Sequence, residues 1–248
     1  MKRLLSKSSI VLILILATQV FIVPPANSSG IGRDTSKSFN SGASAASQTI
    51  SYTVGSTANA FLTVTFVSNQ TGSDDVTSVT YNGVAMTQQQ KVTTNGNARW
   101  SYYLFIASPD GSAHNLVINY SPNDSSKGVI ASWNGAKQSG LDASTNRSNT
   151  TGPFNDAITT VADNSWTLLD LVSIDGNWTV GSGSNNVIGS GASSTAIFDS
   201  NGVIHPAGSN TMTSTNSTYS RDTLRSEMSI APFLAAASSF DALLISGD

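Results

Sequence analysis

The chain has 248 residues and no cysteine, and charged residues make up only 11% of it. Its 15 acidic residues outnumber its 12 basic residues, for a net charge of −3, and beyond the first seven residues the basic residues form no cluster. This composition excludes a disulfide-stapled domain, nucleic-acid binding through clustered phosphate contacts, and electrostatic docking to anionic lipid.

Residues 1–28 carry the pattern of a secretory signal peptide. A positively charged start is followed by an apolar run over residues 8–23 and by small residues at 26–28, the order that precedes a cleavage site. The apolar run is shorter than the ~20 residues of a spanning helix, which favours cleavage over a retained membrane anchor. Cleavage removes Lys2, Arg3 and Lys7 and leaves 9 basic against 15 acidic residues.

We expect a protein that is secreted or at the cell surface, with no further membrane contact. An exported chain without cysteine is more typical of bacteria.

Residues 29–48 are small and polar, in the order SGIGRDTSKSFNSGASAASQ. Such a segment buries too little apolar surface to offset the entropy of ordering. It is therefore predicted to be a disordered, flexible leader, and a domain boundary is predicted near Gln48. The folded domain is expected to span residues 49–232.

Alternation of apolar and polar residues predicts strands in the first part of this domain. Asn82-Gly83 is a strong hairpin signal, because both central residues of a type I′ turn need positive φ. Residues 100–107 (WSYYLFIA) are apolar on both faces, which predicts a central, covered strand. The other strands are expected at Phe61 to Val67, Val76 to Tyr81, His114 to Tyr120 and Gly128 to Trp133.

The second part of the domain gives weaker signals. Residues 137–155 are predicted to be a long polar connection, followed by strands over 157–161 and 166–174. Further strands are expected at 178–180, 185–189, 195–199, 211–216 and 226–232. No internal repeat is clear. Short strands separated by turn residues predict an all-β fold, a single sandwich. Only Phe233 to Ile245, within the apolar tail at 233–248, offers a helical segment.

The order of these segments resembles a known class of module. The residues that carry the resemblance are AFLTVTFV, VTSVTYNGVAMT, WSYYLFIASPDGSAHNLVINY, GVIASWNG and ITTVADNSWTLLDLV. Together they resemble concanavalin-like jelly-roll modules of bacterial and phage-associated surface proteins, over about residues 50–232. The resemblance implies a jelly-roll β-sandwich with an adhesive, carbohydrate-contacting or structural role. It carries no catalytic or binding residue over to this chain.

Two aromatic residues are candidates for carbohydrate binding, because flat rings stack on the apolar faces of sugars. Trp178 and Tyr219 lie among polar, loop-like residues, whereas Trp100, Trp133 and Trp166 lie in apolar strands and are expected in the core. The alternative is that Trp178 and Tyr219 close the edge of the sandwich.

Calcium is the cofactor that the loops favour, because it binds carboxylate, amide and carbonyl oxygens. The candidate ligands are Asp74, Asp75, Asp124 and Asp175. None of these loops matches a known calcium motif, and Asp and Asn also simply form turns. No cofactor is therefore assigned.

Catalysis is not expected. Glycosidases need two placed carboxylates, and the chain has a single glutamate, Glu227, with Asp170 as a partner only if their faces meet in a groove. The alternative is an ion pair of Glu227 with Arg225 on a solvated face. The two histidines, His114 and His205, have no nucleophile elbow or metal-ligand spacing beside them.

Three functions remain open. The first is a non-catalytic exported module that binds a glycan or another extracellular surface polymer. The second is a self-assembling structural subunit that uses the apolar tail at 233–248 to contact a neighbouring copy. The third is a glycoside-active enzyme.

Overall fold

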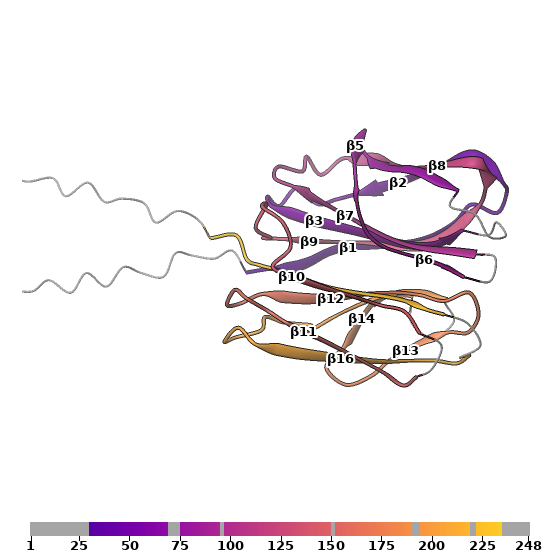
Figure 1. Cartoon of the computed structure of the whole chain (residues 1–248). Helices are drawn as coiled ribbons and strands as arrows, with labels where there is room; N and C mark the ends of the chain where they lie inside the picture. The colour runs from indigo at the N-terminus through magenta and orange to yellow at the C-terminus, as the bar shows by residue number, and fades with distance from the viewer. Residues whose placement is uncertain are drawn as a thin grey trace, which may run out of the picture.

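The computed structural model describes residues 30–68, 75–94, 97–149, 152–189, 194–218 and 222–234 (Figure 1). All regular structure in these residues is β-strand, and the strands form antiparallel sheets. The predicted all-β sandwich class is confirmed. A search of the described ranges finds no helix long and apolar enough to cross a membrane. The predicted signal peptide and most of the tail lie outside the described residues.

The first half of the chain forms two sheets. In sheet I the strand order is β1 (Gly32–Asn40), β9 (Ser126–Asn134), β3 (Ala60–Ser68), β7 (Asn97–Ile106) and β6 (Thr87–Thr94). In sheet II the order is β2 (Ala45–Thr53), β8 (Ala113–Asp124), β4 (Val76–Tyr81) and β5 (Val84–Ala85). Sheets I and II enclose one apolar core and form the first sandwich.

The second half forms two more sheets. In sheet III the order is β10 (Ala143–Arg147), β17 (Leu224–Ile230), β12 (Trp166–Val172), β15 (Thr195–Asp199) and β14 (Asn185–Ile188). In sheet IV the order is β11 (Phe154–Thr159), β16 (Ser209–Asn216) and β13 (Trp178–Val180). Sheets III and IV enclose a second core and form the second sandwich.

The two sandwiches are stacked through sheets I and III, so the layers follow the order II, I, III, IV (Figure 1). A further apolar core lies between sheets I and III and includes Phe61, Trp133, Leu168, Ile197 and Met228. Both faces of these two sheets are therefore covered, and every residue of β3, β12 and β17 is buried. The expected sandwich is thus present twice.

The strand orders show that the two sandwiches share one topology. The order β1-β9-β3-β7-β6 of sheet I recurs in chain sequence as β10-β17-β12-β15-β14 in sheet III. Likewise β2-β8-β4 of sheet II corresponds to β11-β16-β13 of sheet IV. The chain is therefore a structural duplication. Its sequence does not reveal the repeat, because the two halves fill equivalent positions with different residues.

The prediction of a flexible leader over residues 29–48 is wrong from Gly32 onward. This segment forms β1 and the start of β2. Polar side chains hold β1 in place: Arg33 forms an ion pair with Asp199, and Asp34 accepts a hydrogen bond of 2.8 Å from Ser132 Oγ. An edge strand can be polar because backbone hydrogen bonds, rather than apolar burial, attach it to the sheet.

The predicted polar connection over 137–155 also contains structure. Strand β10 lies inside it, and β11 begins at Phe154. By contrast, the weakly predicted strands near 178–180, 185–189, 195–199 and 211–216 are all present as β13 to β16. Strand β10 (ASTNR) gives no comparable signal, because it has no apolar residue except Ala143.

Phe61 tests whether the two sandwiches form one cooperative unit. Its ring is fully buried between sheets I and III and packs on Phe105 and Trp133. We expect Phe61→Ala to lower the free energy of unfolding by about 3–5 kcal/mol. Because both sandwiches share this core, tryptophan fluorescence and far-UV circular dichroism should report one shifted transition in chemical denaturation.

The matched control is Val203→Ala, at a side chain that is 45% exposed, with an expected change within about 0.5 kcal/mol. Two separate transitions, with only one displaced in Phe61→Ala, would show that the sandwiches unfold independently.

Candidate functional site

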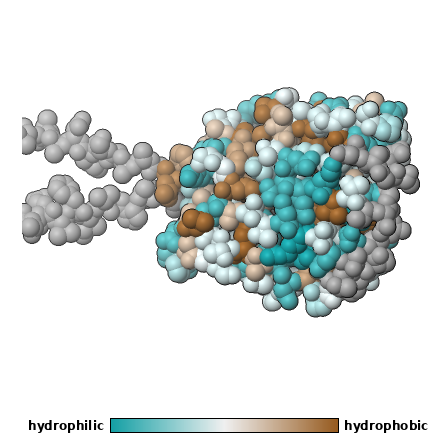
Figure 2. All heavy atoms as spheres, viewed as in Figure 1, coloured by the Kyte–Doolittle hydropathy of each residue, from teal (hydrophilic) through white to brown (hydrophobic). Residues whose placement is uncertain are grey.

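Both ends of the described chain lie at one end of the double sandwich, here called the terminal end (Figure 1). Gly32 in β1 pairs with Asn134 at the end of β9, and the Phe233 backbone N–H donates to the Gly135 carbonyl. Four exposed large apolar side chains of the described residues lie at or beside this end: Val84, Val161, Val203 and Leu234. Figure 2 shows apolar residues gathered there.

A cleft of about 310 Å³ opens at the terminal end of the first sandwich. It lies between the β4–β5 turn and the β7–β8 loop. The turn is the predicted Asn82-Gly83 pair, and both residues have positive φ, 51° and 76°. The apolar walls come from Val84, Leu104 and Ile106. The volume lies at the lower end of the range for small-molecule sites.

Polar groups stand along one side of this cleft. The Asp110 carboxylate oxygens lie 2.9 and 3.0 Å from His114 Nε2. The hydrogen bond from the Ser112 backbone N–H, followed by the one from His114, lowers the pKa of Asp110. Tyr81 presents its ring edge-on to the imidazole, while its hydroxyl donates to the Tyr52 carbonyl. The cleft thus combines apolar walls with fixed hydrogen-bonding groups.

The second sandwich offers a natural comparison. Its β15–β16 loop corresponds to the β7–β8 loop and carries the other histidine, His205. His205 Nδ1 lies 4.0 Å from the Asp163 carboxylate, and both side chains are more than half exposed. His205 therefore lies within its loop, whereas His114 is near the start of β8, directly after the equivalent loop, and lines the cleft.

The prediction that Trp178 is an exposed, sugar-stacking ring is wrong. The residue is 0% exposed and packs on Phe154 in the core of the second sandwich. Its indole N–H donates to the Ser194 carbonyl at 3.0 Å. The polar residues around it in sequence belong to the turn before β13, where Asp175 and Asn177 face solvent while Trp178 points inward. Tyr219 lies outside the described residues.

The predicted calcium ligands are only partly brought together. Asp75 and Asp124 are both buried in the first sandwich, and their carboxyl groups share a hydrogen bond. Desolvation, then the neighbouring Asp124, raises the pKa of Asp75 to about 7. Asp175 is in the second sandwich, and Asp74 is outside the described residues. Within the described ranges no three acidic, histidine or cysteine residues form a metal-binding group.

Asp170 and Glu227 do not face each other. In the register of sheet III, Glu227 pairs with Leu169 and Ser226 pairs with Asp170, so their side chains leave opposite faces of the sheet. Asp170 points to sheet I and accepts hydrogen bonds from Thr63 Oγ1 (2.7 Å) and Ser101 Oγ (2.6 Å). Glu227 points into the second sandwich. This arrangement removes the carboxylate pair that the glycosidase alternative required.

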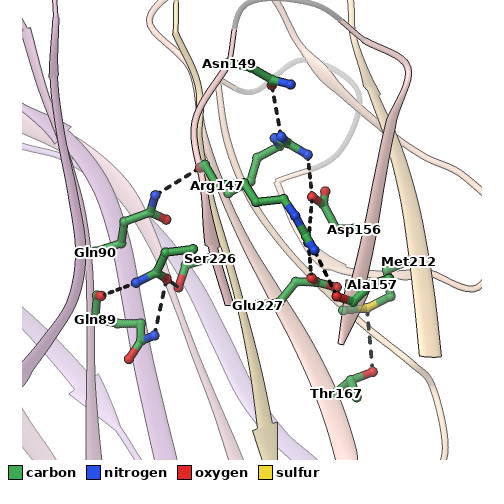
Figure 3. Close-up of polar contacts among 12 residues, drawn as sticks. Gln89, Gln90, Arg147, Asn149, Asp156, Ala157, Thr167, Met212, Ser226 and Glu227 are labelled. Atoms are coloured by element: carbon green, nitrogen blue, oxygen red, sulfur yellow. Dashed lines mark hydrogen bonds and ion pairs between the residues drawn. The ribbon is translucent and has the colours of Figure 1, made fainter. Parts of the chain in front are cut away.

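Glu227 belongs instead to an ionic cluster with Asp156 and Arg225, which are buried, and with Arg147, which is partly exposed (Figure 3). Arg147 Nη1 donates to Glu227 at 2.6 Å and lies 3.5 Å from Asp156, and Arg225 forms an ion pair with Asp156. Burial raises the pKa of Glu227 to about 7, and burial also raises the pKa of Asp156. The expected solvated pair of Glu227 and Arg225 is therefore wrong, because that face of β17 is covered by β11.

The equivalent positions of the first sandwich are not charged. One cross-strand row of sheet III consists of Leu171, Arg225 and Arg147. The matching row of sheet I consists of Phe66, Gly128 and Phe39. The next row pairs Leu169 with Glu227, where sheet I pairs Val64 with Ile130. At these two rows the second sandwich thus has charged side chains where the first sandwich has uncharged residues.

Sequence reasoning did not single out Arg147 or Asp156. For Asp156 a signal existed, because period two places it on the same face as Phe154 and Ile158. Arg147 gave none, since β10 has no alternating pattern.

Comparison with known proteins gives no further identification. No family model matches the sequence, and no curated protein matches it either.

Asp170 provides a test of buried charge between the sandwiches. Desolvation raises its pKa from 3.8 to about 7, and its Oδ1 has no hydrogen-bond partner among the described residues. The folded state holds the Asp170 proton more tightly than the unfolded state does. The contribution of this proton to the free energy of unfolding is therefore fully present below pH 4. It is lost as the pH rises from about 4 to about 7.

Over this interval the free energy of unfolding of the unmodified protein falls as the pH rises. We expect Asp170→Asn to make this slope less steep by up to about 1.4 kcal/mol per pH unit. The measurement is urea denaturation at pH 4, 5.5, 7 and 8, with Asp163→Asn at an exposed position as the control. Parallel pH profiles for Asp170→Asn and the unmodified protein would contradict the assignment.

A double-mutant cycle tests the ionic cluster. Arg147→Phe, which introduces the residue type of the matching Phe39, should cost about 3–5 kcal/mol at pH 8 because it leaves Glu227 buried without its strongest partner. Adding Glu227→Ile, after the matching Ile130, should recover at least half of this loss, since Arg225 and Asp156 still pair. Additive losses in chemical denaturation would show that the two side chains act independently.

Proposed function

We propose that this protein is a non-catalytic exported module that binds a glycan or another extracellular surface polymer. Export rests on the signal-peptide pattern of residues 1–28. The observation that carries the binding proposal is the cleft beside Tyr81 and His114. The proposal also includes the finer fold type suggested by the sequence, a concanavalin-like jelly roll.

The chemistry of the cleft suits a sugar ring. A pyranose has an apolar face and a rim of hydroxyl groups, and the cleft offers Leu104 and Ile106 as apolar contacts. The Asn82 amide, the Asp110 carboxylate and the His114 imidazole line the same space and can bond hydroxyl groups. A site of this size accepts one ring of a polymer while the remainder runs over the surface.

Position also favours the terminal end as the contact surface. Both faces of sheets I and III are covered by neighbouring sheets, and the terminal end presents loops and exposed apolar side chains. Loops carried by a rigid scaffold are where binding residues concentrate. Self-association through residues 233–248 and calcium binding stay predictions, and the glycosidase alternative has lost the carboxylate pair on which it depended.

Sedimentation with insoluble polysaccharides tests the proposal. The protein is mixed with cellulose, chitin or peptidoglycan, and the bound fraction is measured with and without calcium. We expect Asn82→Gly, which keeps a turn residue that tolerates positive φ, and His114→Ala each to weaken binding about tenfold, or about 1.4 kcal/mol.

The matched control is His205→Ala, in the loop of the second sandwich that corresponds to the β7–β8 loop beside the cleft, which should bind as the unmodified protein does. Thermal unfolding of all variants shows whether the fold is retained. Equal binding by His114→Ala and His205→Ala would place the site elsewhere, and no retention on any polymer would count against glycan binding.

A further inference from the structure

A second, larger depression lies at the terminal end, beside the point where the described chain ends. This groove has a volume of about 760 Å³ and lies between the β9–β10 connection, the β11–β12 loop and residues 231–234. Its apolar lining includes Leu141, Ala162 and Phe233. Two side chains in it face solvent strongly: Val161 is 75% exposed and Leu234 is 63% exposed.

The groove is preformed. The Asp142 carboxylate accepts hydrogen bonds from the Val161 and Ala162 backbone N–H groups at 2.8 and 2.9 Å, and from Ser229 Oγ at 3.0 Å. The far wall is fixed by the Lys137 N–H, which donates to the Ala231 carbonyl at 2.8 Å. An apolar groove with a rigid frame and exposed valine and leucine side chains is typical of a surface that another segment covers.

The sequence that follows Leu234 has the composition of such a segment. Residues 235–239 (AAASS) have small side chains. The five residues are enough to reverse the direction of the chain, because connections of two to five residues suffice for a tight turn. Residues 240–245 (FDALLI) then supply Phe240, Leu243, Leu244 and Ile245. The segment also carries Asp241, and Lys137 stands at the rim of the groove.

We infer that residues 240–245 fold back and occupy this groove in the same chain. Leu234 already lines the groove, so the segment is tethered at its own docking surface. Such a tether gives a local concentration in the millimolar range, which favours the chain's own segment over that of a second copy. The interaction is independent of glycan binding, because the cleft beside His114 and the groove share no residue.

The absence of cysteine makes a direct test straightforward. The double variant Val161→Cys/Leu244→Cys places one thiol in the groove and one in the segment. The control Val203→Cys/Leu244→Cys uses an exposed valine at the same end of the molecule but outside the groove. Both proteins are oxidised with oxidised glutathione, and the products are resolved by non-reducing electrophoresis and intact mass.

We expect the 161/244 pair to form an intramolecular disulfide in a monomer at least ten times faster than the 203/244 pair. Equal rates for the two pairs would overturn the inference. A covalent dimer as the main 161/244 product would also overturn it, and would make a second copy the occupant. Deletion of residues 235–248 provides an independent readout, in which binding of the apolar dye ANS should rise at least twofold without a change in far-UV circular dichroism.

Discussion

The face-to-face contact of sheets I and III is the constraint on which the rest of the structure depends. A sheet in an isolated sandwich has one solvated face, but here both central sheets are covered on both faces. The central strands β3 and β12 are accordingly mostly apolar, as in FLTVTFV and WTLLDLV. A polar group at this contact needs a partner across it, because burying it alone is costly. Thr63 and Ser101 bond Asp170, and Arg33 pairs with Asp199.

The duplicated topology makes the ionic cluster informative. Two sandwiches with the same strand order solve the same packing problem with different chemistry at equivalent rows. In the first sandwich, Gly128 leaves room for the Phe39 ring, one atom of which would lie only 2.7 Å from a Cβ added at residue 128. In the second sandwich, the equivalent residue is Arg225, which forms an ion pair with Asp156 of the same sandwich. The charges satisfy one another only when β10, β11 and β17 come together. Buried ions add little net stability, but they restrict which strands can pair.

The covered sheets leave the terminal end as the place where we expect this molecule to meet others. Its cleft, its groove and its exposed apolar side chains lie on turns, on connections and at the ends of strands. The surroundings of the two histidines differ as the two cores do. The first sandwich has a cleft beside His114, and in the second sandwich His205 stands in an exposed loop. The two sandwiches therefore share a framework but differ in their connections and core rows.

The sequence by itself determined the all-β class, the Asn82-Gly83 hairpin and most strands, because these depend on local pattern and turn chemistry, and its first 28 residues predict export. It could not indicate that the sandwich is double, since alternation identifies strands but not the sheet that covers them. Polar β1 and β10 escaped prediction because edge strands are attached by backbone hydrogen bonds. Trp178 was misplaced because a polar neighbourhood in sequence does not fix the direction of a side chain. The cleft, the groove and the cluster around Asp156 join residues from distant strands, so only tertiary packing decided where apolar surface stayed exposed and where charge became buried.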